Sequence, residues 1–325
     1  MKSLVNYQEI EKAYNRISNY ATKTPLLSSD LLNKEFSSNI FIKAENLQKI
    51  GAFKFRGAMN SILKLDDDKK NVLAWSSGNH AQAIASACYL TNKNATIVMP
   101  EDSPNAKLNG TKSWGANIVT FDRYSESREE IGTNLAKEIN AEIIPPFDHP
   151  DVINGQGTVG YEIIKDCKNN NLVPDLVLCC CGGGGLIAGV STAIKSQYPN
   201  APIFAVEPED YNDTYLSLRD NKITEVDVSK KSICDSLLAS KPGKLTFSIN
   251  KENLSGSLLV SDLEALKAMK YAFQYFKIIL EPGGAVALAS ALFNKIDIKN
   301  KTVVIIASGG NVDPDIFEKS LKISI

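Results

Sequence analysis

A run of four glycines joins an apolar stretch to a helical pattern, and this is the most informative segment for chemistry. The apolar stretch Asp175–Cys181 leads directly into Gly182–Gly185, and LIAGVSTAIKSQY follows. A strand that leads through glycines into the start of a helix points its backbone N–H groups at an anion, and a phosphate is the usual ligand. A tight left-handed turn is the alternative, but one glycine would suffice for it, and four cost chain entropy. Because the run lacks the Lys-Ser/Thr of a Walker loop and the downstream acid of a dinucleotide fingerprint, it predicts a cradle for another phosphate-bearing group.

A lysine flanked by two aromatic rings is the second candidate group. Lys54 lies between Phe53 and Phe55 in the segment Gly51–Ala58. An apolar setting disfavours the ammonium form, so it prepares the neutral amine to act as a nucleophile. Taken alone, such a lysine is more often a surface residue whose aliphatic stem covers apolar groups. Together with a phosphate cradle it indicates pyridoxal phosphate, a phosphate-bearing aldehyde that enzymes hold through a lysine.

Two more polar segments follow apolar strand patterns. Ser76–Gln82 (SSGNHAQ) comes after NVLAW, and Ala307–Asp313 (ASGGNVD) comes after TVVII. Small hydroxyls and an amide at a strand end and a helix start suit a carboxylate or a ring oxygen. Helix capping by the serines is the alternative, and the two interpretations are compatible. Ser308 in the second segment is placed either to bond a ring nitrogen or to cap a helix.

The composition excludes several classes of protein. In the 325 residues, 43% are hydrophobic and 22% are charged, so a disordered, collagenous or coiled-coil chain is not expected. The net charge of -1 removes the usual electrostatic reason to expect nucleic acid or an anionic membrane as a partner. No apolar run approaches the ~18 residues of a membrane-spanning helix. The start of the chain mixes charges among its apolar positions, unlike a signal peptide, and we expect a cytoplasmic protein.

Cysteine and histidine usage narrows the chemistry further. Three of the six cysteines are consecutive, which is poor geometry for disulfides or a four-cysteine zinc site. The cysteines are therefore expected to be small buried hydrophobic residues in a reducing compartment. Since the only histidines are His80 and His149, a histidine-rich metal site is excluded.

Short apolar runs alternate with helical patterns, which predicts an α/β protein with two domains, each a mainly parallel sheet flanked by helices. The expected strands are Asn39–Ala44, Asn71–Trp75, Ala95–Met99, Ala116–Thr120, Glu142–Ile144, Asp175–Cys181, Ile203–Val206 and Thr302–Ala307. The expected helices are Tyr7–Ile17, Phe55–Leu63, Asn79–Leu90, Pro104–Ser113, Ser127–Ile139, Gly155–Cys167, Leu186–Gln197 and Ser261–Phe276. The charged stretch LDDDKKN marks either a solvated turn or a domain crossing. We predict a small domain of residues 71–147 inserted into a large domain of residues 1–67 and 151–325.

Four motifs follow one another along the chain: the Lys54 segment, Ser76–Gln82, the glycine run and Ala307–Asp313. In this order they resemble the motifs of fold-type II pyridoxal-phosphate enzymes, specifically the serine/threonine dehydratase and serine racemase family. The resemblance covers nearly the whole chain. It includes MPEDSPNAK (99–107), GQGTVGYEI (155–163), VEPED (206–210), KPGKLTF (241–247) and EPGGAVALA (281–289). The fold it implies has two sheet-containing domains, like the β subunit of tryptophan synthase.

The resemblance implies the cofactor-binding residues Phe53, Lys54, Asn79, Gly182, Gly183, Gly184, Gly185, Leu186 and Ser308. Lys54 resembles the lysine that binds the cofactor aldehyde covalently, and Phe53 the ring that packs beside the cofactor. Asn79 matches the asparagine that bonds the 3-oxygen of the pyridine ring. Ser308 matches the serine that faces the pyridine nitrogen, and Gly182 to Leu186 match the phosphate cradle.

For the substrate, the resemblance implies a loop of Ser76, Ser77, Asn79 and His80 that grips the α-carboxylate. Ser77 also occupies the position at which serine racemases place a second catalytic acid/base, opposite the lysine. Arg128 matches an arginine near the site in the racemase and hydroxyaspartate branch, where a guanidinium could pair with a second carboxylate. Its alternative is a surface arginine beside two glutamates.

The resemblance also implies a site for a divalent cation. Glu207, Asp213 and the carbonyl of Tyr211 match oxygen ligands that suit Mg²⁺ or Ca²⁺. Without the resemblance, Glu207 and Asp213 would be interpreted as surface charges.

The family has further patterns from which this chain departs. Ala52 replaces a frequent serine, Ser236 replaces the glycine of an Asp-Gly pair, and Phe147 aligns with an asparagine that holds substrate in some racemases.

The leading functional hypothesis is an L-threonine/L-serine ammonia-lyase that removes the Cα proton and the β-hydroxyl, giving a 2-oxo acid and ammonia. The second is a 3-hydroxyaspartate ammonia-lyase or a serine racemase. A non-catalytic cofactor-binding sensor is the alternative from another class, and the intact lysine, asparagine, serine and glycine motifs argue against it. A nucleotide-binding module is a further alternative. Family members are commonly dimers, so a homodimer is expected.

Overall fold

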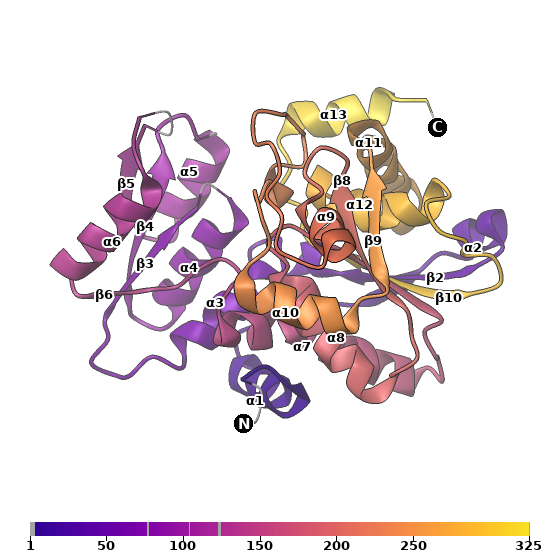
Figure 1. Cartoon of the computed structure of the whole chain (residues 1–325), viewed down its shortest axis with the longest axis horizontal. Helices are drawn as coiled ribbons and strands as arrows, with labels where there is room; N and C mark the ends of the chain where they lie inside the picture. The colour runs from indigo at the N-terminus through magenta and orange to yellow at the C-terminus, as the bar shows by residue number, and fades with distance from the viewer. Residues whose placement is uncertain (1–3, 77, 104, 123–124, 325) are drawn as a thin grey trace.

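The computed structural model describes residues 4–76, 78–103, 105–122 and 125–324. It confirms the predicted α/β class, because two domains each contain a mainly parallel sheet covered by helices (Figure 1). The strands are β1 (Leu26–Ser28), β2 (Asn39–Ala44), β3 (Asn71–Trp75), β4 (Asn94–Pro100), β5 (Asn117–Phe121), β6 (Ala141–Ile143), β7 (Leu176–Cys180), β8 (Ile203–Pro208), β9 (Gly256–Val260) and β10 (Thr302–Ala307). The α-helices are α1 (Tyr7–Ile17), α2 (Asp30–Phe36), α3 (Lys54–Ile62), α4 (Asn79–Leu90), α5 (Asn105–Lys112), α6 (Arg128–Glu138), α7 (Pro150–Asn169), α8 (Gly185–Gln197), α9 (Asp213–Asp220), α10 (Lys244–Asn253), α11 (Asp262–Tyr271), α12 (Pro282–Leu292) and α13 (Pro314–Lys322). Short helical turns form η1 (Glu45–Leu47), η2 (Asp235–Leu237) and the π-helical η3 (Ala272–Phe276).

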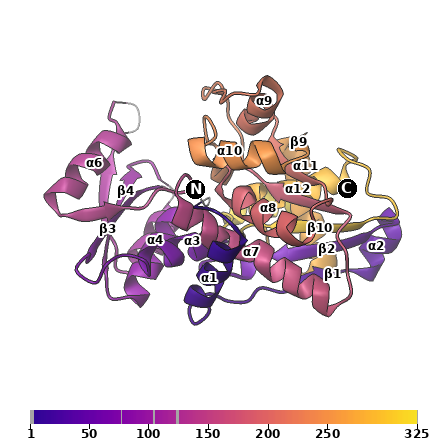
Figure 2. The same cartoon turned by 60° about the horizontal axis from the view of Figure 1, so that its bottom comes forward.

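The larger sheet has the strand order β1-β2-β10-β7-β8-β9. Of the strand pairs that the described residues form in this sheet, only β1–β2 is antiparallel, and Figure 2 shows β1, β2 and β10 side by side. Every residue of β7 is buried, as expected for a parallel strand covered on both faces. In Figure 1, α11, α12 and α13 lie above strands β2 and β10 of this sheet, and α7 and α8 lie below them.

The smaller sheet has the order β5-β4-β3-β6, and all its pairs are parallel. It consists of consecutive strands with α4, α5 and α6 between them, so this part of the chain builds a sheet of its own. The expected domain bounds, 71–147 against 1–67 with 151–325, remain a prediction.

Helix α3 lies where the two domains meet. From Phe55 to Ile62 every residue of this helix is buried. Phe55 and Met59 belong to the same apolar cluster as Val72 of β3 and Ile84 of α4, which are part of the smaller domain. The first residue of α3 is Lys54, so packing between the domains fixes the position of the candidate nucleophile.

Three helices are in backbone contact because glycines lie at their crossings. A Cβ atom on Gly155 of α7 would lie 2.6 Å from the carbonyl oxygen of Arg56 in α3. A Cβ atom on Gly189 of α8 would lie 2.4 Å from the carbonyl oxygen of Ile153 in α7. Any side chain at these positions would push the helices apart. Helix α7 therefore holds the start of α3 and the start of α8 at a fixed separation.

The predicted helix at Gly155–Cys167 was too short, because α7 begins at Pro150. Proline at the first helical position is favoured, and the Nδ1 atom of His149 accepts a hydrogen bond from the backbone N–H of Asp151 at 3.2 Å. The glycines in the first turns concealed this start. The predicted helix Ser261–Phe276 is correct in extent, but its last five residues form the π-helical η3. The edge strands β1 and β9 and the helices α2, α9, α10, α12 and α13 were not predicted.

No helix of the described residues is both long and apolar enough to cross a membrane.

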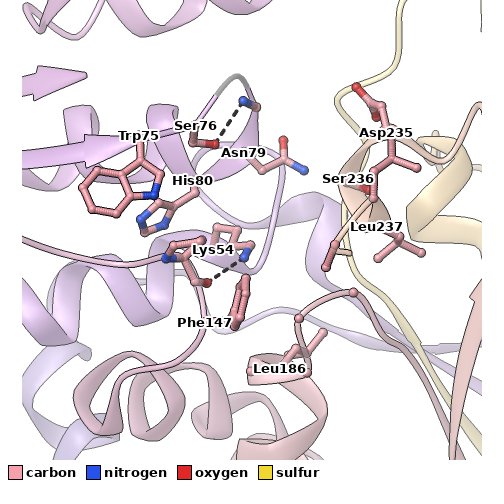
Figure 3. Close-up of a pocket in the computed structure, with 18 of the residues that line it drawn as sticks. Lys54, Trp75, Ser76, Asn79, His80, Phe147, Leu186, Asp235, Ser236 and Leu237 are labelled. Carbon is pink, nitrogen blue, oxygen red and sulfur yellow. Dashed lines mark hydrogen bonds between the residues drawn. The ribbon is translucent and has the colours of Figure 1, made fainter. Parts of the chain in front are cut away.

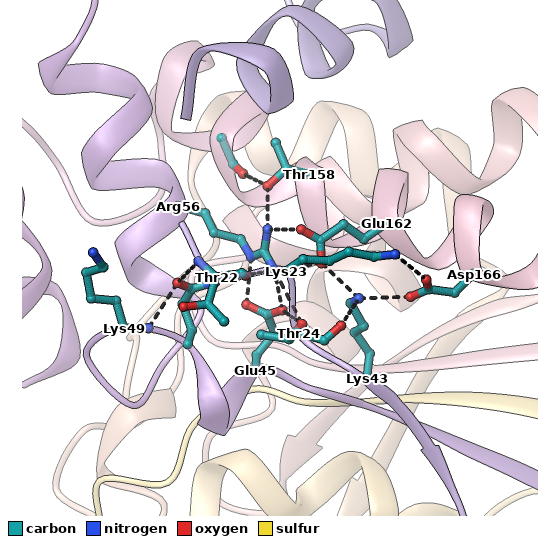
Figure 4. Close-up of polar contacts among 12 residues, drawn as sticks. Thr22, Lys23, Thr24, Lys43, Glu45, Lys49, Arg56, Thr158, Glu162 and Asp166 are labelled. Atoms are coloured by element: carbon teal, nitrogen blue, oxygen red, sulfur yellow. Dashed lines mark hydrogen bonds and ion pairs between the residues drawn. The ribbon is translucent and has the colours of Figure 1, made fainter. Parts of the chain in front are cut away.

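A buried network of charges connects the start of α3 with the larger domain (Figure 4). The guanidinium of Arg56 is fully buried and forms ion pairs with Glu45 at 2.8 Å and Glu162 at 2.7 Å. Lys43 of β2 forms ion pairs with Glu162 at 2.8 Å and Asp166 at 3.1 Å. Each buried charge thus has partners of opposite sign, which is the condition for tolerating it in the interior.

We predict that Arg56→Met lowers the free energy of unfolding by about 3–5 kcal/mol, because it leaves the buried carboxylate of Glu45 without its cationic partner and Glu162 with Lys43 alone. Arg219→Met is the matched control, since Arg219 pairs with Asp220 at the surface, and it should change stability by less than about 0.5 kcal/mol. Urea unfolding of both variants, followed by circular dichroism, measures the difference. Equal midpoints for the two variants would contradict the stabilising role of the network.

Candidate active site

A cavity of about 530 Å³ lies between the two domains and contains most of the predicted site residues (Figure 3). Its walls come from the carboxyl ends of β3, β7 and β10 and from the first turns of α3, α4 and α8. Ligands of parallel α/β sheets bind at such strand ends, where helix N-termini also converge. All of the predicted cofactor-binding residues line this cavity.

Lys54 is the first residue of α3 and projects into the cavity (Figure 3). Its Nζ atom donates a hydrogen bond to the carbonyl oxygen of Pro146 at 2.8 Å and lies 5.3 Å from the centre of the Phe53 ring. Burial lowers the pKa of Lys54 to about 8, although the negative charges of Cys180 and Glu281 act in the opposite direction. A substantial fraction of the amine is therefore neutral near physiological pH, as a nucleophile or base requires.

The glycine run turns from β7 into α8 at the floor of the cavity. Gly184 has φ +88°, a left-handed conformation that favours glycine. Gly183 has no room for a side chain, because a Cβ atom there would lie 2.4 Å from the Phe147 ring. Within the described residues, no acceptor receives a hydrogen bond from the backbone N–H of Gly183, Gly184 or Gly185. The loop thus offers several backbone donors at a helix N-terminus, which is the arrangement that binds phosphate.

Asn79 is held in one orientation at the start of α4. Its amide nitrogen donates to Glu281 at 2.6 Å, and its amide oxygen accepts from Asn311 at 2.8 Å. One N–H of Asn79 is left to donate to a ring oxygen. Ser308, which directly follows β10, is 3% exposed and lines the same cavity.

Cys180 lines the cavity beside Lys54 and Ser308. Hydrogen bonds from Cys179 and Ser308 and the charge of Lys54 lower the pKa of its thiol, against the effect of burial. All six cysteines are buried, and no disulfide forms among them. Burial raises the pKa of Cys88 and Cys234 to about 12, so those thiols are inert, as expected for small hydrophobic residues.

His80 is a neutral residue in the wall of the cavity. Its Nε2 atom hydrogen-bonds the carbonyl oxygen of Ile144 at 2.9 Å, and burial lowers its pKa to about 3. The imidazole therefore contributes no positive charge toward a carboxylate. In the same loop, Ser76 lines the cavity and its hydroxyl accepts from the N–H of Gly78 at 3.2 Å. Ser77, the predicted second acid/base, lies outside the described residues.

Arg128 lies at the rim of the cavity, at the first position of α6. Its side chain is 55% exposed, and its Nε atom donates to Glu129 at 2.8 Å. A weak surface ion pair of this kind leaves the guanidinium available for a stronger partner.

The predicted cation ligands lie away from this cavity, at the end of β8. Both Glu207 and Asp213 are fully buried, so the alternative of surface charges is wrong. Glu207 accepts hydrogen bonds from the backbone N–H groups of Thr214 at 2.7 Å and Tyr215 at 2.8 Å. Neither carboxylate oxygen of Asp213 has a hydrogen-bond partner among the described residues. Burial raises the pKa of Glu207 to about 7 and that of Asp213 to about 9, with Glu207 adding to the latter shift.

Several residues of the site were not predicted from the sequence. Glu281 and Asn311 orient Asn79, a role that the sequence assigned to neither, although Asn311 lies in the predicted polar segment Ala307–Asp313 and Glu281 in a segment of the family resemblance. Pro146 enters the cavity from the segment before α7, beside Phe147, which the sequence marked only as a departure from the family pattern. Thr246 hydrogen-bonds the glycine loop from α10. Their common signal is a position in the first turn of a helix or shortly before it, which becomes meaningful only once the helices are placed.

Comparison with known proteins identifies the family. Residues 17–309 match the family model described as pyridoxal-phosphate dependent enzyme. The chain belongs to this family. An L-threo-3-hydroxyaspartate ammonia-lyase of Saccharomyces cerevisiae is 45% identical over 94% of this chain and 93% of its own length. A serine racemase of Schizosaccharomyces pombe is 41% identical over 95% of each chain. The solved serine racemase of maize is 35% identical, with a TM-score of 0.92 over 98% of this chain and 97% of its own.

The protein is therefore an enzyme whose cofactor is pyridoxal phosphate, in the class of ammonia-lyases and racemases. The described residues fit this cofactor. Free backbone donors at the glycine loop match the phosphate, and an amine of lowered pKa matches the aldehyde.

We predict that Lys54→Ala eliminates both the covalent linkage to the cofactor and turnover, because Lys54 is the amine of lowered pKa that lines the cavity. Borohydride reduction followed by peptide mass spectrometry locates the linkage, and absorbance spectra follow the cofactor. Lys49→Ala is the control, since Lys49 lies near Phe55 outside the cavity lining and should keep the linkage. A reducible linkage that persists in Lys54→Ala would show that another lysine holds the cofactor.

Proposed function

We propose that this enzyme eliminates the β-hydroxyl of an L-amino acid, with L-threonine or L-serine as substrate, and releases a 2-oxo acid and ammonia. The observation that carries the proposal is the convergence of Lys54, the glycine loop and Asn79 on one cavity at the junction of the domains. Pyridoxal phosphate supplies an aldehyde that takes up the substrate amine and a ring that accepts the electrons left when Cα loses its proton.

The residues of the chain have distinct tasks in this proposal. Lys54 binds the cofactor, and its released amine, with a pKa lowered to about 8, accepts the Cα proton. Asn79 donates to the ring oxygen in the orientation that Glu281 and Asn311 impose. The first turn of α4 receives the α-carboxylate, because its backbone N–H groups and helix dipole favour an anion. Ser308 faces the ring nitrogen as a neutral hydroxyl, which favours elimination over a long-lived carbanion.

The smaller domain contributes residues to the cavity wall, and this supports a moving part in the reaction. We propose that residues 71–147 close over the substrate, since they carry both Ser76 and Arg128 on the cavity wall. Closure would remove water from the substrate carboxylate and strengthen its interaction with the helix start.

A second candidate substrate is 3-hydroxyaspartate, and the position of Arg128 favours it. The guanidinium lies at the rim of the cavity with only an exposed glutamate as partner. A substrate with a second carboxylate would pair with this guanidinium when the site closes, because an unpaired buried charge is costly. The yeast relative that is 45% identical carries the name of this activity.

We predict that Arg128→Ala raises the barrier for 3-hydroxyaspartate by about 2–5 kcal/mol, the range for truncating one partner of a buried charge pair. The effect on L-serine and L-threonine should be much smaller. Values of kcat/KM for all three substrates, measured by 2-oxo acid formation, provide the test. Lys137→Ala, in the exposed last turn of α6, is the control. Equal small losses for every substrate would leave threonine and serine as the substrates, whereas equal large losses would place Arg128 at the α-carboxylate.

Serine racemisation is a further candidate, because a relative of 41% identity is named serine racemase. Chiral chromatography of L-serine reactions separates the two outcomes, since elimination consumes serine and racemisation produces D-serine. Absence of turnover with every β-hydroxy amino acid would refute the proposed function and support a cofactor-binding sensor.

We further propose that Glu207, Asp213 and the carbonyl of Tyr211 bind Mg²⁺ or Ca²⁺. The two buried carboxylates support this, because Asp213 has no hydrogen-bond partner among the described residues and a cation would supply the missing positive charge. Hard divalent cations prefer such oxygen ligands.

We predict that a chelator lowers the melting temperature of the enzyme and that added Ca²⁺ or Mg²⁺ restores it. A ligand at 100 times its dissociation constant stabilises the folded state by about 2.7 kcal/mol. Asp213→Asn should abolish the cation-dependent shift, whereas Asp210→Asn, at an exposed ion pair three residues away, should keep it. A shift that is unchanged in Asp213→Asn would exclude this site.

The cellular compartment and the assembly are also proposals. We propose a cytoplasmic homodimer, for which the exposed large apolar side chains Leu263, Phe273 and Ile279 offer contact area. Light scattering of the purified enzyme measures its mass in solution.

A further inference from the structure

Helix α10 lies against the glycine loop and holds two of its carbonyl groups. The hydroxyl of Thr246 donates to the carbonyl oxygen of Gly183 at 2.7 Å, and the amide of Asn250 donates to that of Gly184 at 3.3 Å. Thr246 and Asn250 are four residues apart, so their side chains leave the same face of the helix. Both residues are buried, at 0% and 1% exposed.

The direction of each carbonyl fixes the direction of the next amide. In a trans peptide the C=O and the following N–H point to opposite sides of the chain. Since the carbonyl of Gly183 points to Thr246, the N–H of Gly184 points away from α10. The carbonyl of Gly184, held by Asn250, sets the N–H of Gly185 in the same way. No acceptor among the described residues receives either N–H, and both glycines line the cavity.

A run of glycines cannot maintain this arrangement by itself. Glycine has the largest conformational freedom of all residues, and Gly184 adopts φ +88°. A Cβ atom on Gly184 would lie 2.7 Å from the amide nitrogen of Asn250 and 3.1 Å from the Thr246 hydroxyl. The absence of a side chain thus permits the close approach of α10, and the helix supplies the rigidity that the glycines lack.

Helix α10 is anchored in turn by Asp148, which lies in the segment before α7. The carboxylate of Asp148 accepts hydrogen bonds from the backbone N–H groups of Lys244, Leu245 and Thr246 at 3.0, 2.9 and 3.1 Å. A negative charge at a helix N-terminus is stabilising. Asp148 directly follows Phe147, which packs on Gly183. The loop is therefore enclosed between two segments that are bonded to each other.

We propose that Thr246 and Asn250 are positioning residues that turn the amides of the glycine loop toward the cofactor phosphate. Neither residue lines the cavity, so they act through the loop and not by contact with the cofactor. This inference rests on the proposed binding of the phosphate at Gly182–Leu186.

The test compares pyridoxal phosphate with pyridoxal, which has the same aldehyde and ring but no phosphate. Thr246→Val keeps the shape of the side chain and removes the donor, whereas Thr246→Ser keeps the hydroxyl. We expect Thr246→Val to weaken pyridoxal phosphate binding roughly tenfold, which corresponds to about 1.4 kcal/mol. Pyridoxal binding should change by less than about twofold, and Thr246→Ser should resemble the wild type. Absorbance titrations after cofactor removal from the full-length holoenzyme give both dissociation constants.

Asn250→Leu provides a second variant in case Thr246→Val does not fold. It also removes a donor to the loop without adding charge, and it should show the same selective loss for pyridoxal phosphate. Ser248→Ala is the control on the same helix, because Ser248 is exposed and bonds only the carbonyl of Leu245 among the described residues. The ³¹P NMR signal of the bound cofactor adds a direct measure of the phosphate environment, which should shift in Thr246→Val and Asn250→Leu but not in Ser248→Ala.

The possible results separate this inference from the proposed function. An equal loss of affinity for pyridoxal phosphate and pyridoxal would mean that α10 only supports the fold, and it would overturn the inference. Unchanged affinity for both would also overturn it. The wild-type enzyme tests the underlying assumption separately, because a phosphate bound at the loop requires wild-type affinity to be much higher for pyridoxal phosphate than for pyridoxal. Turnover of β-hydroxy amino acids by the wild type is independent of all these results.

Discussion

The arrangement of the site depends on the contact of three helices through glycine. Because α3, α7 and α8 meet at backbone distance, the start of α3 and the start of α8 belong to one rigid block. Lys54 stands at one of these helix starts and the glycine loop at the other. The distance between the amine and the phosphate donors is therefore set by main-chain packing, which tolerates far less variation than contacts between long side chains. A cofactor with an aldehyde at one end and a phosphate at the other requires such a fixed span.

Electrostatics around this block separates groups that stay charged from groups that lose their charge. Arg56 keeps its charge in the interior because carboxylates surround it, and it needs no water. Lys54, only two residues earlier, has a hydrogen bond to a carbonyl oxygen but no ion pair with any described residue, and burial lowers its pKa. His80 is neutral for the same reason. The sequence places Lys54 and Arg56 close together along the chain, yet their different partners decide which becomes a nucleophile and which a structural charge.

The sequence predicted those features that depend on local patterns. Strands β2, β3 and β10 were placed with correct ends, since their apolar runs are bounded by polar or turn residues. Helix α10 was missed because its polar sequence has no clear apolar period, and its start depends on Asp148, almost a hundred residues earlier in the chain. The orientation of Asn79 by Asn311 likewise joins distant segments. Pattern analysis finds the residues that touch a ligand, whereas the residues that hold them in place emerge only from the fold.

The burial of α3 from its second residue to its last limits how this segment can change during evolution. No residue from Phe55 to Ile62 faces solvent, so the helix has no side on which an added or lost residue could be absorbed. A single insertion would rotate the following residues by about 100° around the helix axis. It would then move Arg56 away from its carboxylates or Lys54 away from the cavity, depending on which end stayed in place. Sequence drift here is restricted to substitutions that conserve volume, and length changes must be confined to the turns before Lys54 and after Ile62.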